Sequence, residues 1–276
     1  MIKKYRPDVD AILARRHDND GEYWATPDGR LLVGEPFSTL TSLLMLHELK
    51  VPRTHEAVRG ALDLVRRAWR PDGRFRLAPS GGIYPCATAA AARLLCRFGQ
   101  ARSPETRKTL LHLLETQYED GGWRCNKFPF GRGPETRFSN PGVTLPVLDV
   151  FRFTDHLNRN PALDRAVDSL LDHWVVRRPL GPCHFGIGTL FLQVEFPFLR
   201  YNLFHYVYVL SFYDRAKGDP RFLEALRLLG SKLDAHGRVI VERPNRRLAG
   251  LSFCAAGQPS GPATVRYREI VKNVEG

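Results

Sequence analysis

The sequence predicts an all-α fold in which helical hairpins form a toroid. Capping positions recur at intervals of 49, 57 and 59 residues, and each precedes an amphipathic helix pattern that ends at a glycine turn. A second proline series, at intervals of 49, 56 and 56 residues, precedes a more apolar helix pattern. A repeat of about 50 residues with two helices per unit is typical of chains that stack one supersecondary unit many times.

The first helix of each unit is expected to begin at a capping residue followed by proline. Ser103-Pro104, Asn160-Pro161 and Asp219-Pro220 each place a side-chain acceptor before a proline at the first helical position, where the missing N–H is not needed. Thr54 is the expected equivalent in the preceding unit, and the segment Val9 to Gly21 repeats the pattern without its proline.

Each of these first helices has apolar residues at helical spacing on one face, which predicts an outer helix that faces water on its other side. The helices are expected to end at left-handed glycine turns. These turns are Asp72-Gly73, Gly121-Gly122, Leu180-Gly181 and His236-Gly237.

The second helix of each unit is expected to follow Pro36, Pro85, Pro141 or Pro197. These segments are apolar all round, and such a helix has to be buried on every side. We therefore predict apolar helices inside the ring and amphipathic helices outside it. Five hairpins can be identified and a complete toroid commonly has six, so we expect five or six, in a single domain spanning residues 1–276.

The composition excludes several classes of protein. Hydrophobic residues make up 43% and charged residues 25% of the chain, which is ordinary for a globular protein. The longest apolar stretch, Gly186 to Tyr213, is interrupted by charged residues and proline, so a transmembrane segment is not expected. The opening residues lack the apolar core of a secretory signal, and five cysteines show no disulfide-like spacing, which favours a cytoplasmic location.

The net charge of +12 suits an anionic partner. A small anionic substrate and a peripheral anionic membrane surface both fit this charge. The basic residues do not cluster into an arm, so nucleic-acid binding is not expected. Arginine-rich solvated helix faces explain the charge equally well.

Gln117 to Trp123, which reads Gln-Tyr-Glu-Asp-Gly-Gly-Trp, matches the Gln-x(2 to 5)-Gly-x-Trp repeat of the squalene and oxidosqualene cyclases. Asp72 to Phe75 is a degenerate copy of the same motif. The chain thus resembles a small member of the terpenoid cyclase and protein prenyltransferase superfamily. The resemblance implies an α/α toroid in which the glutamine caps a helix end and the tryptophan packs against the neighbouring hairpin.

Two further segments are similar to the protein prenyltransferase β subunits. Gly121 to Lys127 is similar to their Gly-Gly-Phe followed by Arg-x-Asn-Lys, which implies that Arg124 and Lys127 bind an isoprenoid diphosphate. His205 to Ser211 resembles their His-x-x-Tyr-x-Leu-Ser, whose histidine binds zinc. The Asp-x-Cys that supplies the remaining zinc ligands is absent, because Phe128 to Gly131 stands in its place.

A third segment, Cys183 to Gly188, is similar to the Cys-His-Gly-x-x-Gly of the lanthionine cyclases, in which an earlier Trp-Cys completes a zinc site. This similarity implies a zinc site with cysteine and histidine ligands, and no cofactor other than zinc is expected. The candidate metal ligands are Cys125, Cys183, His184 and His205.

The residues themselves suggest where a substrate would bind. Arg124, Lys127 and Arg137 lie in one long polar loop, and arginine matches phosphate groups in a bidentate manner, so the loop is a candidate anion clamp. Tyr201 and Tyr208 flank His205 at i, i+4 and i+7, which places the three on one helix face that lines the hole of the toroid. A solvated loop and a hydrogen-bonded core histidine are the alternative interpretations.

The sequence therefore favours an enzyme that holds an isoprenoid or similar apolar substrate with an anionic, diphosphate-like head in a central cavity, with His205 and Cys125 at the reacting end. An acid-initiated cyclase is a second hypothesis. Because the Asp-x-Asp-Asp motif of such cyclases is absent, Glu195 is its candidate acid. A non-catalytic toroid that binds ligands or acts as a scaffold is a third hypothesis, and no partner subunit is evident.

Overall fold

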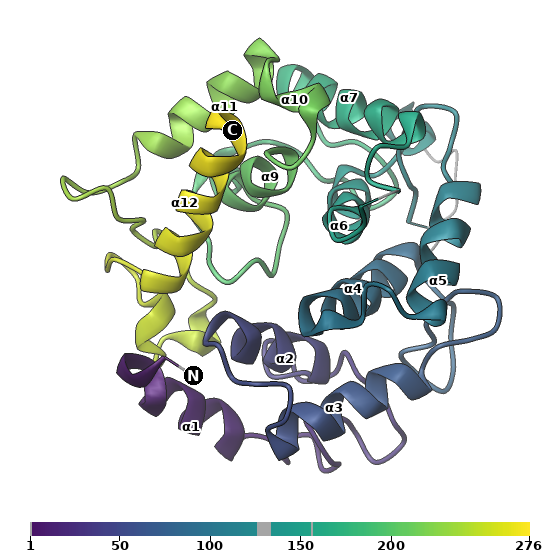
Figure 1. Ribbon diagram of the computed structural model, residues 1–276, viewed down its shortest axis with the longest axis vertical. Helices are drawn as coiled ribbons and strands as arrows, with labels where there is room; N and C mark the ends of the chain where they lie inside the picture. Colours follow the sequence, from purple (N-terminus) through teal and green to yellow (C-terminus); the bar gives the residue numbers. More distant parts are fainter. Residues whose placement is uncertain (1, 126–133, 156) are drawn as a thin grey trace.

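The computed structural model describes residues 2–125, 134–155 and 157–276. Every regular element in these ranges is a helix. Figure 1 shows the helices arranged as a ring, in which one helix of each hairpin lies outside and the other lies toward the centre. The predicted all-α toroid is confirmed.

Five hairpins make up the ring. The outer helices are α1 (Arg6–Ala14), α3 (Glu56–Arg67), α5 (Pro104–Glu115), α7 (Pro161–Val176) and α11 (Pro220–Gly230). Their partners are α2 (Thr39–Glu48), α4 (Pro85–Leu95), α6 (Pro141–Phe151), α9 (Leu203–Leu210) and α12 (Gly261–Glu275). The shorter helices α8 (Thr189–Leu192) and α10 (Asp214–Lys217) lie in the connections before and after α9.

The predicted proline caps set the starts of three outer helices. Ser103 accepts a hydrogen bond from the Thr106 amide, and Asn160 and Asp219 accept from the second residue of the helices that they precede. The glycine turns after the outer helices have a left-handed backbone, with φ of 86° at Gly73 and 90° at Gly121. Residues with a Cβ atom rarely adopt this conformation, which explains the glycines.

Four predicted helix starts are wrong in detail. Helix α3 follows His55 with no side-chain cap, so Thr54 is not its cap. The opening helix does contain a proline, Pro7, in its first turn. Helix α2 begins three residues after Pro36, where Ser38 is the cap, and α9 begins six residues after Pro197, where Asn202 is the cap. In the last two cases a side-chain acceptor, rather than the proline, satisfies the first helical amides.

The division into inner and outer helices follows the sequence pattern. Every residue of α9 is buried, whereas α3 buries residues at helical spacing, Ala57, Ala61 and Val65 among them, and exposes the rest. Helices that are apolar all round thus lie inside the ring, and amphipathic helices cover them.

The Gln-Trp motif joins the third hairpin to the fourth. The Gln117 amide donates hydrogen bonds to the carbonyls of Gly121 and of Ala162, which lies in the first turn of α7. The Trp123 indole donates to the Leu113 carbonyl at 2.7 Å and stacks on Phe151. The glutamine therefore makes the contact with the neighbouring hairpin, whereas these two contacts of Trp123 lie within its own hairpin.

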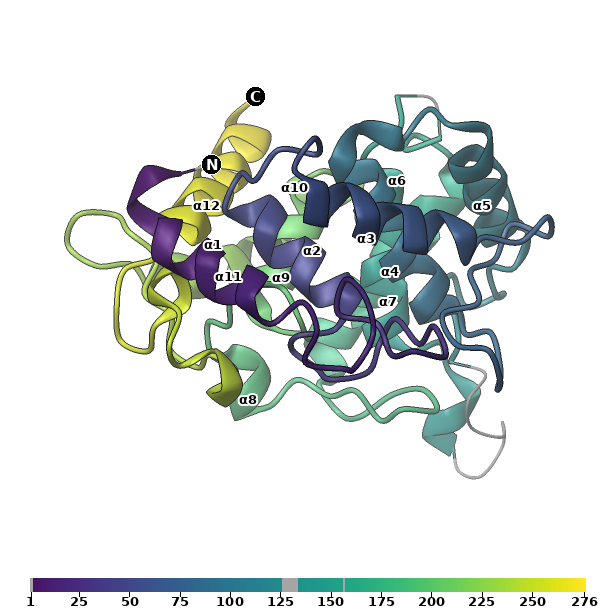
Figure 2. The same cartoon turned by 90° about the horizontal axis from the view of Figure 1, so that it is seen from below.

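The first and last hairpins close the ring. The Asp8 carboxylate, in α1, accepts hydrogen bonds from the Ser252 amide, the Ser252 hydroxyl and the Phe253 amide at 2.7–2.9 Å. Arg266, in α12, pairs with Glu48 at the end of α2. Figure 2 shows the connection that carries α8 at one end of the ring and the C-terminus at the other end. No described helix combines the length and the apolar character needed to cross a membrane.

Candidate functional site

A cavity of about 370 Å³ lies at the end of the ring where the inner helices begin. Its wall is formed by one side of α4 from Cys86 to Arg93, by the first half of α6, by the segment that precedes α9 together with His205, and by Phe185. Most of this wall is apolar, with Leu145, Phe198 and Leu199 among its residues, and Arg93 and His205 supply polar groups. A concave, mostly apolar space of this volume with a few convergent polar groups is typical of a small-molecule site.

The polar part of the cavity is built around Arg93, Asp149 and His205. Nη1 of Arg93 lies 3.3 Å from Oδ2 of Asp149 and 3.5 Å from Nε2 of His205. The Arg93 side chain is 11% exposed, and its Nε atom has no hydrogen-bond partner in the described ranges. The Nε atom is itself buried, so an anionic ligand in the cavity would meet the exposed part of the Arg93 side chain.

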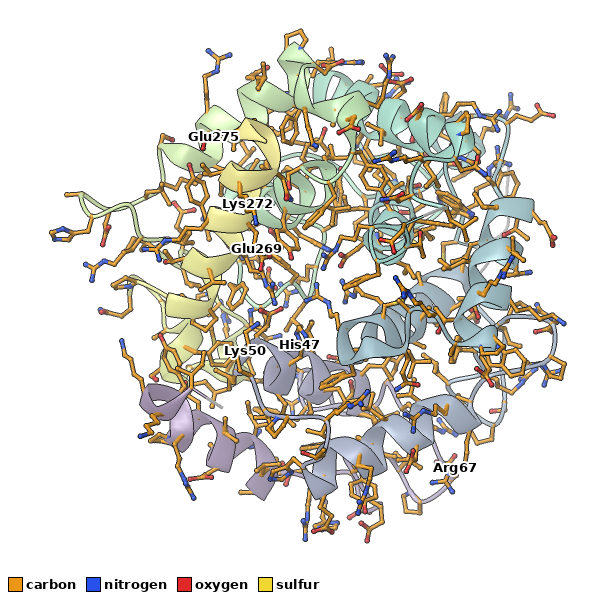
Figure 3. The ribbon with its side chains drawn as sticks, in the orientation of Figure 1. His47, Lys50, Arg67, Glu269, Lys272 and Glu275 are labelled. Atoms are coloured by element: carbon orange, nitrogen blue, oxygen red, sulfur yellow. The ribbon has the colours of Figure 1, made fainter. Side chains whose placement is uncertain are left out.

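Behind this base, buried ion pairs fill the centre of the ring. Arg97 pairs with Glu48 and Asp149, and Arg266 pairs with Glu48 and Glu269. His47 and Glu269 lie beside the centre of the ring in Figure 3. We call the following set the central ion network: Glu48, Arg93, Arg97, Asp149, Arg152, His205, Arg266 and Glu269.

The central ion network controls the protonation of its members. Burial alone would raise the pKa of Asp149, but Arg152, Arg97 and a hydrogen bond from His205 outweigh it and hold the pKa well below its usual value. Burial lowers the pKa of His205 despite the neighbouring carboxylate. Asp149 is therefore ionised at neutral pH and His205 is neutral, so Asp149 is a poor proton donor.

The structure places two of the predicted site residues, Tyr201 and His205, on the cavity wall. Tyr208 lies deeper, in the central ion network, where its hydroxyl donates to Glu269 at 2.7 Å. Glu195 is buried beside Arg200, and burial raises its pKa although Arg200 and Arg243 oppose this shift. Its carboxyl group does not line the cavity.

The predicted anion clamp lies elsewhere. The Arg124 guanidinium lies over the Tyr118 ring and donates to the Arg137 carbonyl at 2.7 Å, and neither arginine is part of the cavity wall. Arg137 is exposed, and Lys127 lies outside the described residues. The cationic side chains that do belong to the cavity wall are Arg93, from α4, and Arg200, from the segment before α9.

The predicted zinc ligands are divided between separate places. Cys125 is buried and contacts Cys86, whose pKa is raised by this contact, by burial and by the nearby Cys183. His184 is exposed, with Nε2 3.7 Å from Oε1 of Glu135, whereas His205 contacts Asp149. Within residues 2–125, 134–155 and 157–276, no three histidine, cysteine or acidic side chains are placed to hold a metal ion. Zinc binding stays a prediction.

The sequence analysis missed Arg93 and Asp149. Both lie in apolar inner helices, Arg93 in PCATAAAARLL and Asp149 in PGVTLPVLDVF. Charged side chains are almost never fully buried without a partner. A charged residue on an inner helix was therefore a signal that a partner or a site lies inside the ring.

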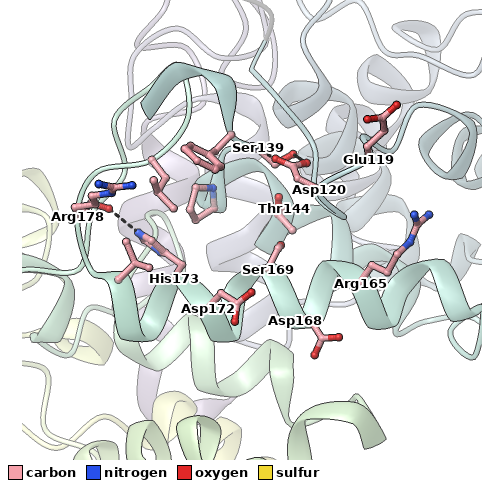
Figure 4. A pocket seen from close by; sticks show the side chains of 14 residues that line it. Glu119, Asp120, Ser139, Thr144, Arg165, Asp168, Ser169, Asp172, His173 and Arg178 are labelled. Carbon is pink, nitrogen blue, oxygen red and sulfur yellow. Dashed lines mark hydrogen bonds between the residues drawn. The ribbon is translucent and has the colours of Figure 1, made fainter. Parts of the chain in front are cut away.

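A second pocket, of about 410 Å³, lies on the outer wall beside α7 (Figure 4). Its three aspartates have protein partners: Asp120 binds Ser139, Asp168 binds Arg215 and Asp172 binds Arg221. His173, in its wall, accepts or donates hydrogen bonds through both ring nitrogens.

Comparisons with known proteins support the fold. No protein-family model matches the sequence, and no curated protein matches it. Among solved structures, a protein from Actinoplanes is 19% identical over 97% of this chain and 80% of its own, with a TM-score of 0.50. The ligand-free type II terpene cyclase MstE from Scytonema is 16% identical over 99% of this chain and 74% of its own, with a TM-score of 0.48.

A variant of that cyclase in complex with its substrate geranylgeranyl dihydroxybenzoate is also similar, at 16% identity over 99% of this chain and 78% of its own, with a TM-score of 0.47. At these identities the likeness concerns the fold.

Proposed function

We propose that this α/α toroid is an enzyme that binds an isoprenoid-like substrate in the cavity lined by α4, α6 and the segment before α9, with the anionic head of the substrate at Arg93. The observation that carries the proposal is the Arg93 guanidinium, which belongs to the wall of an apolar cavity and whose side chain is 11% exposed. An apolar ligand with one anionic group would complement both features.

The wall of the cavity suits the apolar part of such a substrate. Phe185, Phe198 and Tyr201 present aromatic rings from two segments of the chain, and the Phe198 ring stacks on the His205 imidazole at 4.9 Å between centroids. Aromatic faces stabilise cations, and apolar walls exclude the water that would capture one.

The charges suit a leaving diphosphate. Arg93 belongs to the central ion network, in which four arginines accompany three carboxylates. Fixed cationic groups in a buried site stabilise the negative charge that develops on a departing anion. In this proposal the carbon–oxygen bond breaks, its electron pair stays with the diphosphate near Arg93, and the allylic cation remains against the aromatic wall.

Calorimetric binding of farnesyl diphosphate, compared with farnesol, tests the position of the anionic head. Arg93→Gln is expected to weaken binding of farnesyl diphosphate roughly 10- to 100-fold, because a charged hydrogen bond contributes about 1.5–3 kcal/mol, and to leave farnesol binding unchanged. Arg165→Gln, on the exposed outer wall, is the matched control and is expected to change neither affinity. Equal affinity of wild type and Arg93→Gln for farnesyl diphosphate would overturn the assignment.

Release of inorganic diphosphate from farnesyl diphosphate then separates an enzyme from a binding protein. Tight binding that depends on Arg93, without release, would make the chain a non-catalytic isoprenoid-binding toroid. Release that is lost in Arg93→Gln would support catalysis at this cavity.

A second candidate, an acid-initiated cyclase, is favoured by one observation. Burial raises the pKa of Glu195, which keeps its carboxyl group in the proton-donating form over a wider pH range. Arg200 connects this carboxyl group to the cavity wall, since it lies 3.7 Å from Glu195 and lines the cavity itself. Cyclisation of a non-phosphorylated polyene, abolished in Glu195→Gln, would support this candidate over leaving-group chemistry.

A further inference from the structure

A hydrogen bond links the cavity to the outer helix α7. The Tyr201 side chain lines the cavity, and its hydroxyl oxygen lies 2.9 Å from Nδ1 of His173. The other ring nitrogen of His173, Nε2, lies 3.1 Å from the carbonyl oxygen of Arg178. His173 is fully buried, and its ring also packs against the Tyr201 ring at 5.8 Å between centroids.

These two contacts fix the positions of the protons. A carbonyl oxygen can only accept, so Nε2 of neutral His173 has to carry the proton that it donates to Arg178. Nδ1 is then an acceptor, and the Tyr201 hydroxyl donates to it. No described residue donates a hydrogen bond to the Tyr201 oxygen, so its lone pairs are not engaged within the described ranges.

We propose that Tyr201 accepts the proton that a carbocation in this cavity loses, while His173 takes the phenolic proton of Tyr201. The inference rests on the proposed function. A C–H bond next to the cationic carbon breaks, and its electron pair forms a carbon–carbon double bond. The proton forms a new O–H bond on Tyr201 as the original O–H proton passes to Nδ1 of His173, and Tyr201 ends neutral.

The surroundings of His173 suit the acceptor of this transfer. Burial lowers the pKa of His173, which keeps the ring neutral and ready to accept a proton, while the backbone carbonyls of Arg178 and Phe185 favour the protonated form. After the transfer, the imidazolium would donate one hydrogen bond to Arg178 and one to Tyr201. His173 also belongs to the wall of the outer pocket (Figure 4).

His205, the histidine on the cavity wall, is already engaged in the central ion network. Its Nε2 atom lies 3.5 Å from both Oδ2 of Asp149, which favours its protonation, and Nη1 of Arg93, which opposes it. His173 instead contacts backbone carbonyls and the Tyr201 phenol, and no charged side chain of the described ranges pairs with it. We therefore assign Tyr201 as the catalytic proton acceptor and His173 as the residue that positions it and takes up its proton.

Nitrogen-15 NMR of the histidine rings tests the proton positions without any substrate. At neutral pH we expect His173 to carry a proton on Nε2 and none on Nδ1. A proton on Nδ1 would overturn the relay whatever the cavity binds.

Product analysis with farnesyl diphosphate tests the chemistry. In Tyr201→Phe we expect diphosphate release to continue, because Arg93 is intact, while the ratio of alkene to water-captured alcohol falls roughly 100-fold, the lower end of the effect of a positioned proton acceptor. His173→Gln keeps a donor for Arg178 and an acceptor for Tyr201 but cannot take up a proton, so the same fall is expected. This variant separates proton uptake from a purely structural role.

Tyr206→Phe is the matched control. This substitution also removes one buried tyrosine hydroxyl, which donates a hydrogen bond to the Leu170 carbonyl, but Tyr206 does not line the cavity. Its product ratio is expected to equal that of the wild type. An unchanged ratio in Tyr201→Phe, with diphosphate still released, would overturn the relay alone. No diphosphate release by the wild type would overturn the proposed function and the relay together.

Discussion

Oδ2 of Asp149 lies 3.5 Å from Nε2 of His205, so one buried carboxylate connects the cavity wall to the arginines that fill the centre of the ring. The same carboxylate contacts Arg93, Arg97 and Arg152, which come from α4, the turn after it, and the end of α6. It thereby offsets part of the positive charge that three inner segments bring together. The cavity and the stability of the ring depend on the same group.

Asp149→Asn is expected to destabilise the protein by about 3–5 kcal/mol, because it leaves buried arginines without their carboxylate. Urea unfolding at neutral pH measures this loss. Asp168→Asn is the matched control: it removes a carboxylate from an ion pair with Arg215 in which both side chains are exposed, and is expected to cost at most about 1 kcal/mol. Equal losses in the two variants would show that the central ion network contributes no more than a surface pair.

The central ion network also predicts how stability depends on pH. Burial would raise the pKa of Glu48, but Arg266, His47 and Arg97 lower it far below its usual value, and the pKa of Asp149 is lowered as well. A carboxyl group whose folded-state pKa lies below its unfolded value, about 4, stabilises the fold fully above that value. This stabilisation is lost as the pH falls through the folded-state pKa.

We therefore expect the free energy of unfolding to fall from about pH 5 downward. In Glu48→Gln the fall should be shallower by up to about 1.4 kcal/mol per pH unit, since one of the titrating groups is gone. Urea unfolding between pH 3 and 7 measures both slopes. Parallel curves for the wild type and Glu48→Gln would contradict the pKa assignment.

The sequence predicted the parts of the fold that local interactions determine. A cap such as Asn160 and the proline after it act on amides within a few residues, so the start of α7 could be read directly. The starts of α2 and α9 were placed too early, because Pro36 and Pro197 were taken as helix starts when Ser38 and Asn202 cap the helices.

The site was less accessible to prediction because its contacts are long-range. Arg93 meets Asp149 from 56 residues away and His205 from 112 residues away, and no local pattern specifies such pairs. The predicted helix face of Tyr201, His205 and Tyr208 was wrong for Tyr201, because α9 begins only at Leu203. Tyr201 and His205 nevertheless both line the cavity, whereas Tyr208 does not. The loop arginine Arg124 was singled out by a motif, but the fold directs its guanidinium onto the Tyr118 ring.

Gly121→Ala is expected to destabilise the protein by more than Gly29→Ala. Both glycines have a left-handed backbone, with φ of 90° and 82°, which costs alanine about 1–2 kcal/mol. A Cβ atom at Gly121 would also overlap the carbonyl of Arg165 in α7, whereas nothing lies within 4 Å of one at Gly29. The thermal midpoints of the two variants measure the difference, and equal midpoints would show that the contact between the third and fourth hairpins relaxes freely.

Asp8→Asn tests whether the closed ring unfolds as one unit. The Asp8 carboxylate accepts three hydrogen bonds from Ser252 and Phe253, and an amide nitrogen in its place would face a backbone N–H that needs an acceptor. Since hydrogen bonds to charged groups contribute about 1.5–3 kcal/mol each, we expect a loss of about 3 kcal/mol. Asp10→Asn, in the same helix, removes only an exposed contact with Arg6 and is expected to change little.

Hydrogen exchange locates the effect of Asp8→Asn. If closure couples the hairpins, opening the contact between the first and last hairpins unfolds the whole ring. The free energy of exchange should then fall by the same amount at amides of α6, far from the substitution, as at Ser252 and Phe253. Protection that falls only near the seam would mean that the other hairpins hold together as an open arc. In that case the ion pair between Glu48 of α2 and Arg266 of α12 would also have to break while the helices around the cavity stay folded.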